Sequence, residues 1–179
     1  YNYRPEGKGK NLSPNLDRLA AGSTILWGQH IISPVCTPSR YNCLTGRYAS
    51  RATNPDLLAK TEREGMTVVT WNTMVMPGEP TLASYLKKAG YTTGIVGKTH
   101  QVEVPGFTRI PPEADPRSET TKRQLENNVK AKRAAFHAVG FDYAESIYMG
   151  NVKDVHNMEW VTKGALDFIE KNNESPFFL

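Results

Sequence analysis

A cysteine followed four residues later by an arginine is the part of this sequence best suited to chemistry. Cys36 comes after an apolar run, residues 25–32, that we expect to form a strand, and the Ser-Pro pair at 33–34 interrupts that strand. Pro38 suits the first turn of a helix, and Gly46 suits its end. Cys36 is therefore expected at a strand-to-helix junction, where free backbone N–H groups and the helix dipole favour a thiolate or an oxyanion.

The whole run around this cysteine is similar to a known motif. Residues 36–47, Cys-Thr-Pro-Ser-Arg-Tyr-Asn-Cys-Leu-Thr-Gly-Arg, resemble the type I sulfatase signature Cys-x-Pro-Ser-Arg-x-x-x-Leu-Thr-Gly-Arg at its eight specified positions. In that family a formylglycine-generating enzyme oxidises the cysteine to formylglycine, and the hydrated aldehyde is the nucleophile. The resemblance implies that Cys36 is the formylglycine precursor and that Arg40 holds its hydroxyls. A guanidinium suits that role because it never deprotonates.

Two other interpretations of Cys36 follow from the residues alone. Most free cysteines are small buried hydrophobes, and Cys36 near a helix start could be one of them. A cysteine phosphatase needs a longer loop between its cysteine and arginine to wrap a phosphate, and Pro38 removes one donor N–H from this short one. We therefore reject the phosphatase. A disulfide between Cys36 and Cys43 would consume the nucleophile, so Cys43 is expected to face the core from the same helix.

A second motif follows a predicted strand at residues 91–96. Gly-Lys-Thr-His at 97–100 resembles the second sulfatase signature, and strand alternation is expected to place Lys98 and His100 on one side. The resemblance implies that Lys98 binds the sulfate oxygens and that His100 hydrogen-bonds the nucleophile or transfers a proton. The plainer interpretation is that Lys98 is a solvated lysine at a strand end. Gln101 departs from the family pattern, which makes the local loop shape an open question.

The resemblance also implies a divalent cation, usually Ca²⁺, held by hard oxygen ligands. The expected pair of aspartates before Ser13 is absent, and the other ligands would follow residue 179. Cys36, once modified, is the one predicted metal ligand in this chain. We expect the isolated piece to bind metal weakly and to show little activity.

The remaining elements position these side chains. Helices are predicted at residues 13–22, 56–64, 81–90, 118–139 and 158–171, and strands at 91–96 and 176–179. The resemblance to sulfatases implies a further short strand at 140–143. This alternation predicts an α/β fold with a mostly parallel sheet and helices on both faces. The resemblance names it the alkaline-phosphatase-like fold and makes residues 1–179 part of a single sulfatase-like catalytic domain without its first strand and C-terminal portion.

The composition limits the classes of function that the chain can have. The 22 Lys and Arg against 18 Asp and Glu are too scattered to indicate nucleic-acid binding, and no run is apolar enough for a membrane span. The basic positions between 122 and 133 are interpreted as a solvated helix face. The compartment stays open between periplasm, cell exterior, lysosome and cytoplasm.

The function expected from the two motifs is hydrolysis of a small-molecule or glycan sulfate ester to an alcohol and sulfate. One alternative is a formylglycine-dependent phosphonate or phosphate ester hydrolase. Another is a non-catalytic relative that binds sulfate or glycans. The sequence does not distinguish an aryl, sugar or choline-like alcohol.

Overall fold

The computed structural model describes residues 13–28, 30, 33–149 and 157–179, and the chain divides into two compact units at residues 1–31 and 32–179. The described part of the first unit holds one helix, α1 (Pro14–Ala21), as predicted. The strand expected at residues 25–32 is not formed at Ile25 and Leu26, and a turn follows at Trp27 and Gly28. Leu26 is mostly exposed, so the apolar run has no sheet neighbour there; Ile31 and Ile32 lie outside the described residues.

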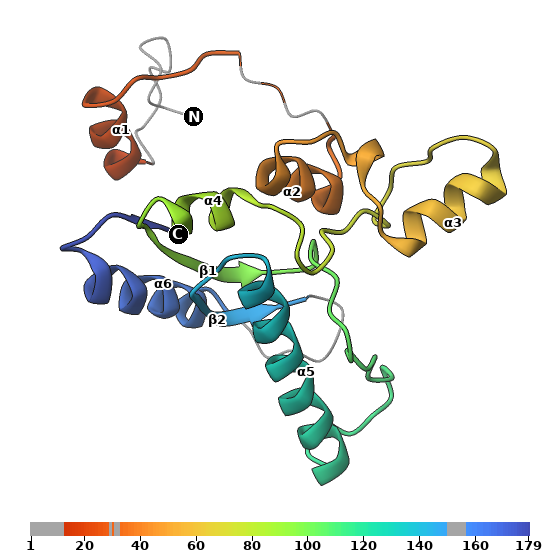
Figure 1. Ribbon diagram of the computed structural model, residues 1–179. Coiled ribbons are helices and arrows are strands. Elements are labelled where there is room, and N and C mark those ends of the chain that lie inside the picture. The colour runs from red at the N-terminus through yellow and green to blue at the C-terminus, as the bar shows by residue number, and fades with distance from the viewer. Residues whose placement is uncertain (1–12, 29, 31–32, 150–156) are drawn as a thin grey trace. The chain divides into compact units, whose positions relative to one another are not determined.

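The second unit is built on a three-stranded parallel sheet (Figure 1). β1 (Thr92–Lys98) lies between β2 (Tyr143–Tyr148) and β3 (Phe177–Phe178). The chain crosses from β1 to β2 through α5 (Glu119–Ala138) and from β2 to β3 through α6 (Met158–Asn172). Parallel neighbours need such crossovers, and the α/β class predicted from the sequence is confirmed.

Helices cover both faces of this sheet. α6 packs against β1 and β2 through two glycines: a Cβ on Gly94 would lie 2.7 Å from Phe168 Cε2, and one on Gly164 would lie 2.5 Å from Ser146 Oγ. The hydrophobic core on the other face joins β1 and β2 to α4 (Leu82–Lys88) and α5, with Phe136 and Phe141 among its buried residues. The close approach on the α6 face requires residues without side chains at both glycine positions.

The pairing of β1 with β2 is irregular just before Lys98 and His100. Ile95 pairs with Ala144 but Gly97 pairs with Ile147, so β2 holds one extra residue, and Ser146 there has φ +50°. Gly97 itself has φ +87°. A bulge of this kind increases local twist and re-aims the side chains that follow. Lys98 is the last residue of β1, and the chain turns away after it.

Three further helical segments precede the sheet: α2 (Cys36–Thr45), the 3₁₀ turn η1 (Ala49–Arg51) and α3 (Pro55–Glu64). Gly46 ends α2 with φ +67°, which is the left-handed cap that the sequence predicted. The helix predicted at 56–64 is confirmed as α3.

The helix predicted at 81–90 is confirmed as α4, but its large apolar residues are not the buried ones. Leu82 and Tyr85 are exposed, whereas Ala83 is fully buried. The start of α4 is fixed by a capping box between Thr81 and Ser84, and the backbone at Gly140 approaches Ser84 so closely that a Cβ would lie 2.5 Å from its nitrogen. Because the backbone of residue 140 packs so closely here, the small side chain of Ala83 is buried in place of the larger Leu82 and Tyr85.

The basic face of α5 also differs from the prediction in part. Lys132 is fully buried, with its ammonium 5.8 Å from the centre of the Phe107 ring. Arg133 pairs with Glu145 of β2, and Lys122 pairs with Glu119 at 2.8 Å. Lys132 and Arg133 thus help attach α5 to the rest of the unit. No helix within the described ranges is long and apolar enough to cross a bilayer.

Candidate active site

Cys36 is the first residue of α2. Val35 before it is extended, with φ −105° and ψ 137°, and its carbonyl accepts a bond from Ser39 N–H at 3.0 Å. Pro38 occupies the first turn, where its lack of an N–H is harmless, and it is buried with Thr37. The thiol of Cys36 is half-buried. The predicted helix start is therefore present at Cys36, although the strand predicted before it is not formed at its described positions.

His100 reaches the same point from the segment after β1. Its Nε2 lies 3.0 Å from Cys36 Sγ. The backbone N–H of His100 donates to the side chain of buried Gln101 at 2.9 Å, and the Gln101 carbonyl accepts from Val75 N–H at 2.8 Å. Gln101, which departs from the family pattern, therefore holds the loop that carries His100.

The electrostatic surroundings keep the His100 imidazole neutral. Burial, followed by the nearby charges of Lys98 and Arg40, lowers the pKa of His100 from 6.5 to about 4. At neutral pH one ring nitrogen therefore carries a proton and the other has a free lone pair. A neutral imidazole in contact with the Cys36 side chain can accept or donate one proton there.

Lys98 and Arg40 place two positive charges beside this pair. Arg40 Nη1 donates to the Lys98 carbonyl at 3.2 Å, which joins α2 to the end of β1. No carboxylate of the described residues forms an ion pair with either side chain. The site is therefore electropositive, as an anionic substrate group requires.

A cavity of about 370 Å³ opens at Cys36, and we call it the Cys36 cavity. Its lining comprises Cys36, Thr37, Trp71, Met74, Lys98, His100 and Met149. Two buried polar atoms of this lining, Thr37 Oγ1 and His100 Nδ1, have no hydrogen-bond partner among the described residues. Buried polar atoms are usually bonded, so the described residues leave these two atoms unsatisfied.

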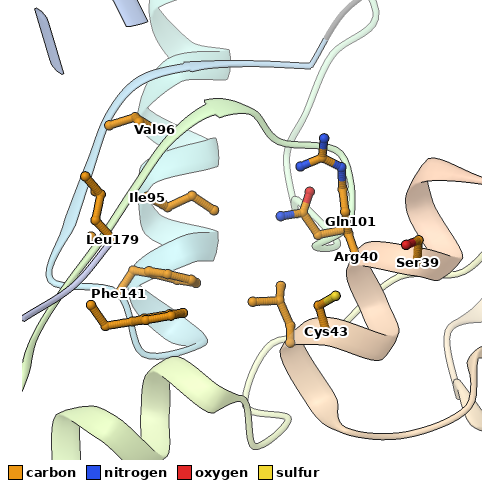
Figure 2. A pocket seen from close by; sticks show the side chains of 11 residues that line it. Ser39, Arg40, Cys43, Ile95, Val96, Gln101, Phe141 and Leu179 are labelled. Atoms are coloured by element: carbon orange, nitrogen blue, oxygen red, sulfur yellow. The ribbon is translucent and has the colours of Figure 1, made fainter. Parts of the chain in front are cut away.

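The predicted residues do not all line this one cavity. Lys98 and His100 share it with Cys36, but Arg40 lines a second cavity of about 450 Å³ together with Cys43, and we call that the Cys43 cavity. Figure 2 shows Ile95 of β1 pointing across it toward α2. Cys43 is exposed and free, so its predicted place in the core was wrong; the buried residue of this part of α2 is Tyr41.

Sequence reasoning missed Glu79, which links two segments of the site. Glu79 accepts a bond from Met76 N–H at 2.8 Å, and its other oxygen lies 3.5 Å from both Tyr41 Oη and Arg47 Nη1. Glu79 thereby links the end of α2 to the segment around Val75. That segment pairs with residues 101–103 through the Val75–Val102 bridge. A single glutamate in a loop carries no local signal for this.

The described residues do not fit a calcium site. No group of three or more His, Cys, Asp and Glu side chains among them could hold a metal ion, and the Cys36 cavity offers one sulfur, one imidazole and one hydroxyl where calcium needs a set of oxygen ligands. Asp142 is engaged elsewhere, accepting from Thr93 N–H at 3.1 Å and pairing with Lys87. His156, another residue type that can bind a metal, lies outside the described residues.

Comparisons with known proteins agree with the two motifs. A family model described as Sulfatase matches residues 3–179. The chain is 40% identical over 89 residues to Steryl-sulfatase of Homo sapiens, which covers 49% of this chain and 15% of that protein. It is 31% identical over 186 residues to N-acetylgalactosamine-6-sulfatase of Mus musculus, which covers 97% of this chain and 35% of that protein. The chain thus spans about a third or less of the length of these relatives.

Proposed function

Because the chain belongs to the sulfatase family, we propose that the whole protein hydrolyses a sulfate ester to an alcohol and sulfate, with formylglycine derived from Cys36 as its nucleophile. The observation that carries this proposal is the contact of His100 Nε2 with Cys36 Sγ at 3.0 Å, in a cavity that Lys98 also lines. A nucleophile, a proton carrier and a cation are the groups that attack on a sulfate ester needs.

The surroundings of Cys36 suit its conversion to formylglycine. The side chain begins a helix and faces a cavity with room for a substrate group. A hydrated aldehyde at position 36 would offer His100 Nε2 a stronger hydrogen bond than the thiol that lies 3.0 Å from it. As a hydrate, formylglycine supplies one hydroxyl to attack sulfur and a second whose deprotonation expels sulfate. A formylglycine-generating enzyme would be the partner during maturation.

The other residues then take distinct parts. Lys98 faces the cavity and binds the sulfate oxygens. His100 is neutral, so its Nε2 holds or moves a proton at the side chain of residue 36. Arg40 fixes the end of β1 through the Lys98 carbonyl and adds positive charge close to the site. In the whole protein, the cation of the family would need carboxylate ligands other than the described residues of this chain.

The deciding experiment is the mass of the peptide that contains Cys36, from whole protein made in a host that has the modifying enzyme. Conversion to the aldehyde or its hydrate supports the proposal, and an unmodified thiol contradicts it and favours a non-catalytic sulfate-binding relative. Rates on matched sulfate, phosphate and phosphonate esters then identify the reaction class. Faster turnover of the phosphorus esters would replace the sulfatase by an ester hydrolase of that kind.

A further inference from the structure

We propose that Gln101 is a positioning residue for the reaction, because its side chain fixes where His100 Nε2 lies against the side chain of residue 36. The inference rests on the proposed sulfate ester hydrolysis and adds a residue at which this chain departs from the sulfatase pattern. Gln101 is 2% exposed, and its Oε1 accepts from the backbone N–H of His100 at 2.9 Å. The imidazole of the same histidine lies 3.0 Å from Cys36 Sγ.

The backbone of His100 lies beyond the end of β1, where the side chain of Gln101 supplies its acceptor. β1 ends at Lys98, and Thr99 N–H donates to the Tyr148 carbonyl of β2 at 2.7 Å. The next N–H, that of His100, donates to the Gln101 side chain instead of a neighbouring strand. Backbone N–H groups away from water are almost always paired, so this bond selects the backbone conformation that carries the imidazole.

Gln101 is itself anchored on its far side. Its carbonyl accepts from the N–H of Val75, which is fully buried, at 2.8 Å. Just before Val75, the fully buried Asn54 accepts from Met74 N–H at 3.1 Å through its Oδ1. The backbone on either side of His100 is therefore held, by β2 on one side and by the segment around Val75 on the other.

The position of the imidazole matters because proton transfer needs direct contact. Burial, followed by the charges of Lys98 and Arg40, lowers the pKa of His100 to about 4, so the ring is neutral and can accept a proton from residue 36. It can do so only while Nε2 stays within hydrogen-bond reach of that side chain. A displacement of about 1 Å can lower the rate of such a step by about a hundredfold.

Gln101 acts on the Cys36 cavity from the neighbouring one. Figure 2 shows Gln101 and Arg40 in the lining of the Cys43 cavity. From there Gln101 bonds the backbone N–H of His100, and Arg40 bonds the carbonyl of Lys98 at 3.2 Å. Sulfate binding is assigned to the Lys98 side chain, so loss of the Gln101 bond should lower kcat and leave the affinity for sulfate unchanged.

The first test uses the Cys36 thiol as a probe, in whole protein made in a host without the modifying enzyme. Iodoacetamide alkylates a thiol faster when a neighbouring base takes its proton, so the rate at Cys36 reports the contact with His100. Trypsin cuts after Arg40, which places Cys36 and Cys43 on separate peptides of one digest. We expect Gln101→Met and His100→Gln each to slow alkylation of Cys36 about tenfold, with the rate at Cys43 unchanged.

An unchanged rate at Cys36 in Gln101→Met would refute the positioning role. So would an unchanged rate in His100→Gln, because the imidazole would then not act on residue 36. Faster alkylation of both cysteines in Gln101→Met would count against it as well, since α2 would then be opening as a whole.

The second test measures turnover of 4-nitrophenyl sulfate by the whole modified protein. Gln101→Met should lower kcat about 10- to 100-fold and leave the inhibition constant for inorganic sulfate unchanged. Gln101→Asn keeps an amide but is one methylene too short to reach the His100 N–H, so it should lose as much. Gln101→Glu keeps the acceptor and should retain most of kcat, and a loss equal to that of Gln101→Met would contradict the proposal.

The matched control is Asn128→Leu on α5. Asn128 is also 2% exposed, and its Oδ1 accepts from Thr108 N–H at 2.9 Å, but it lines neither cavity. This variant should lose as much stability to urea as Gln101→Met while kcat and the alkylation rates stay at wild-type values; equal losses of kcat in the two would overturn the positioning role. Absence of turnover of every sulfate ester, with Cys36 unmodified, would instead overturn the proposed function, and the alkylation rates would still decide the role of Gln101.

Discussion

Replacing Glu79 tests whether a single, mostly buried carboxylate holds the end of α2 to the segment beside His100. The side chain of Glu79 is 14% exposed and accepts from Met76 N–H at 2.8 Å. Its Oε1 also lies 3.5 Å from the hydroxyl of Tyr41, which is fully buried. In Glu79→Ala both donors lose their acceptor, and a buried donor left without a partner costs about 1–3 kcal/mol. We therefore expect the free energy of unfolding to fall by about 2–3 kcal/mol in this variant.

Glu79→Gln removes the charge and keeps one of the two hydrogen bonds. Its amide oxygen can still accept from Met76, while the acceptor for Tyr41 and the ion pair with Arg47 are lost. That pair is long, at 3.5 Å, and the Arg47 side chain is 49% exposed, so its loss should cost less than about 1 kcal/mol. Urea unfolding with an unchanged m-value measures both variants. Adding Tyr41→Phe to Glu79→Ala should recover part of the loss, because the orphaned hydroxyl is then absent.

The control is Glu64→Ala, which removes an exposed carboxylate paired with Arg63 at 3.2 Å and should change stability by less than about 0.5 kcal/mol. The reasoning would be refuted if Glu79→Ala behaved like this control. It would also be refuted if Glu79→Gln were as damaging as Glu79→Ala, because the bond to Met76, which only the glutamine keeps, would then contribute nothing.

Three further predictions concern the sheet and the site. Gly94→Ala should lower the free energy of unfolding by about 1–3 kcal/mol in urea titrations, since its Cβ would lie 2.7 Å from the Phe168 ring, and an unchanged midpoint would contradict the packing. The pKa of His100 is lowered to about 4, so as the pH falls below 6.5 the unfolded chain binds this proton before the folded chain does. The free energy of unfolding should therefore drop between pH 6.5 and 4. His100→Gln should lessen that drop in unfolding curves measured at pH 6.5 and at pH 4. A pH dependence identical to wild type would refute this. Lys98→Met should weaken inhibition by inorganic sulfate about tenfold, whereas Lys122→Met, which removes a lysine paired with Glu119, should not alter the inhibition constant.

Local signals were sufficient for much of the fold. Gly46 ends α2 as predicted because a left-handed cap is a property of one residue and its neighbours. The periodicity of residues 158–171 predicted α6 to within one residue. The strand expected at residues 25–32 was wrong at Ile25 and Leu26 because an apolar run forms a strand only where a neighbour pairs with it, and the sequence of the run does not contain that neighbour.

By itself, the sequence determined which side chains could do chemistry, since the residue types and spacings around Cys36 and at residues 97–100 are fixed by the chain. It also determined that Lys98 and His100 would lie near the carboxyl end of β1. Only the tertiary structure decided that His100 contacts Cys36, 64 residues away along the chain, that Arg40 lines the neighbouring cavity, and that Trp71 borders the site. The physical reason is that these are contacts between segments far apart in sequence, and packing and buried hydrogen bonds such as those of Asn54 and Glu79 select them.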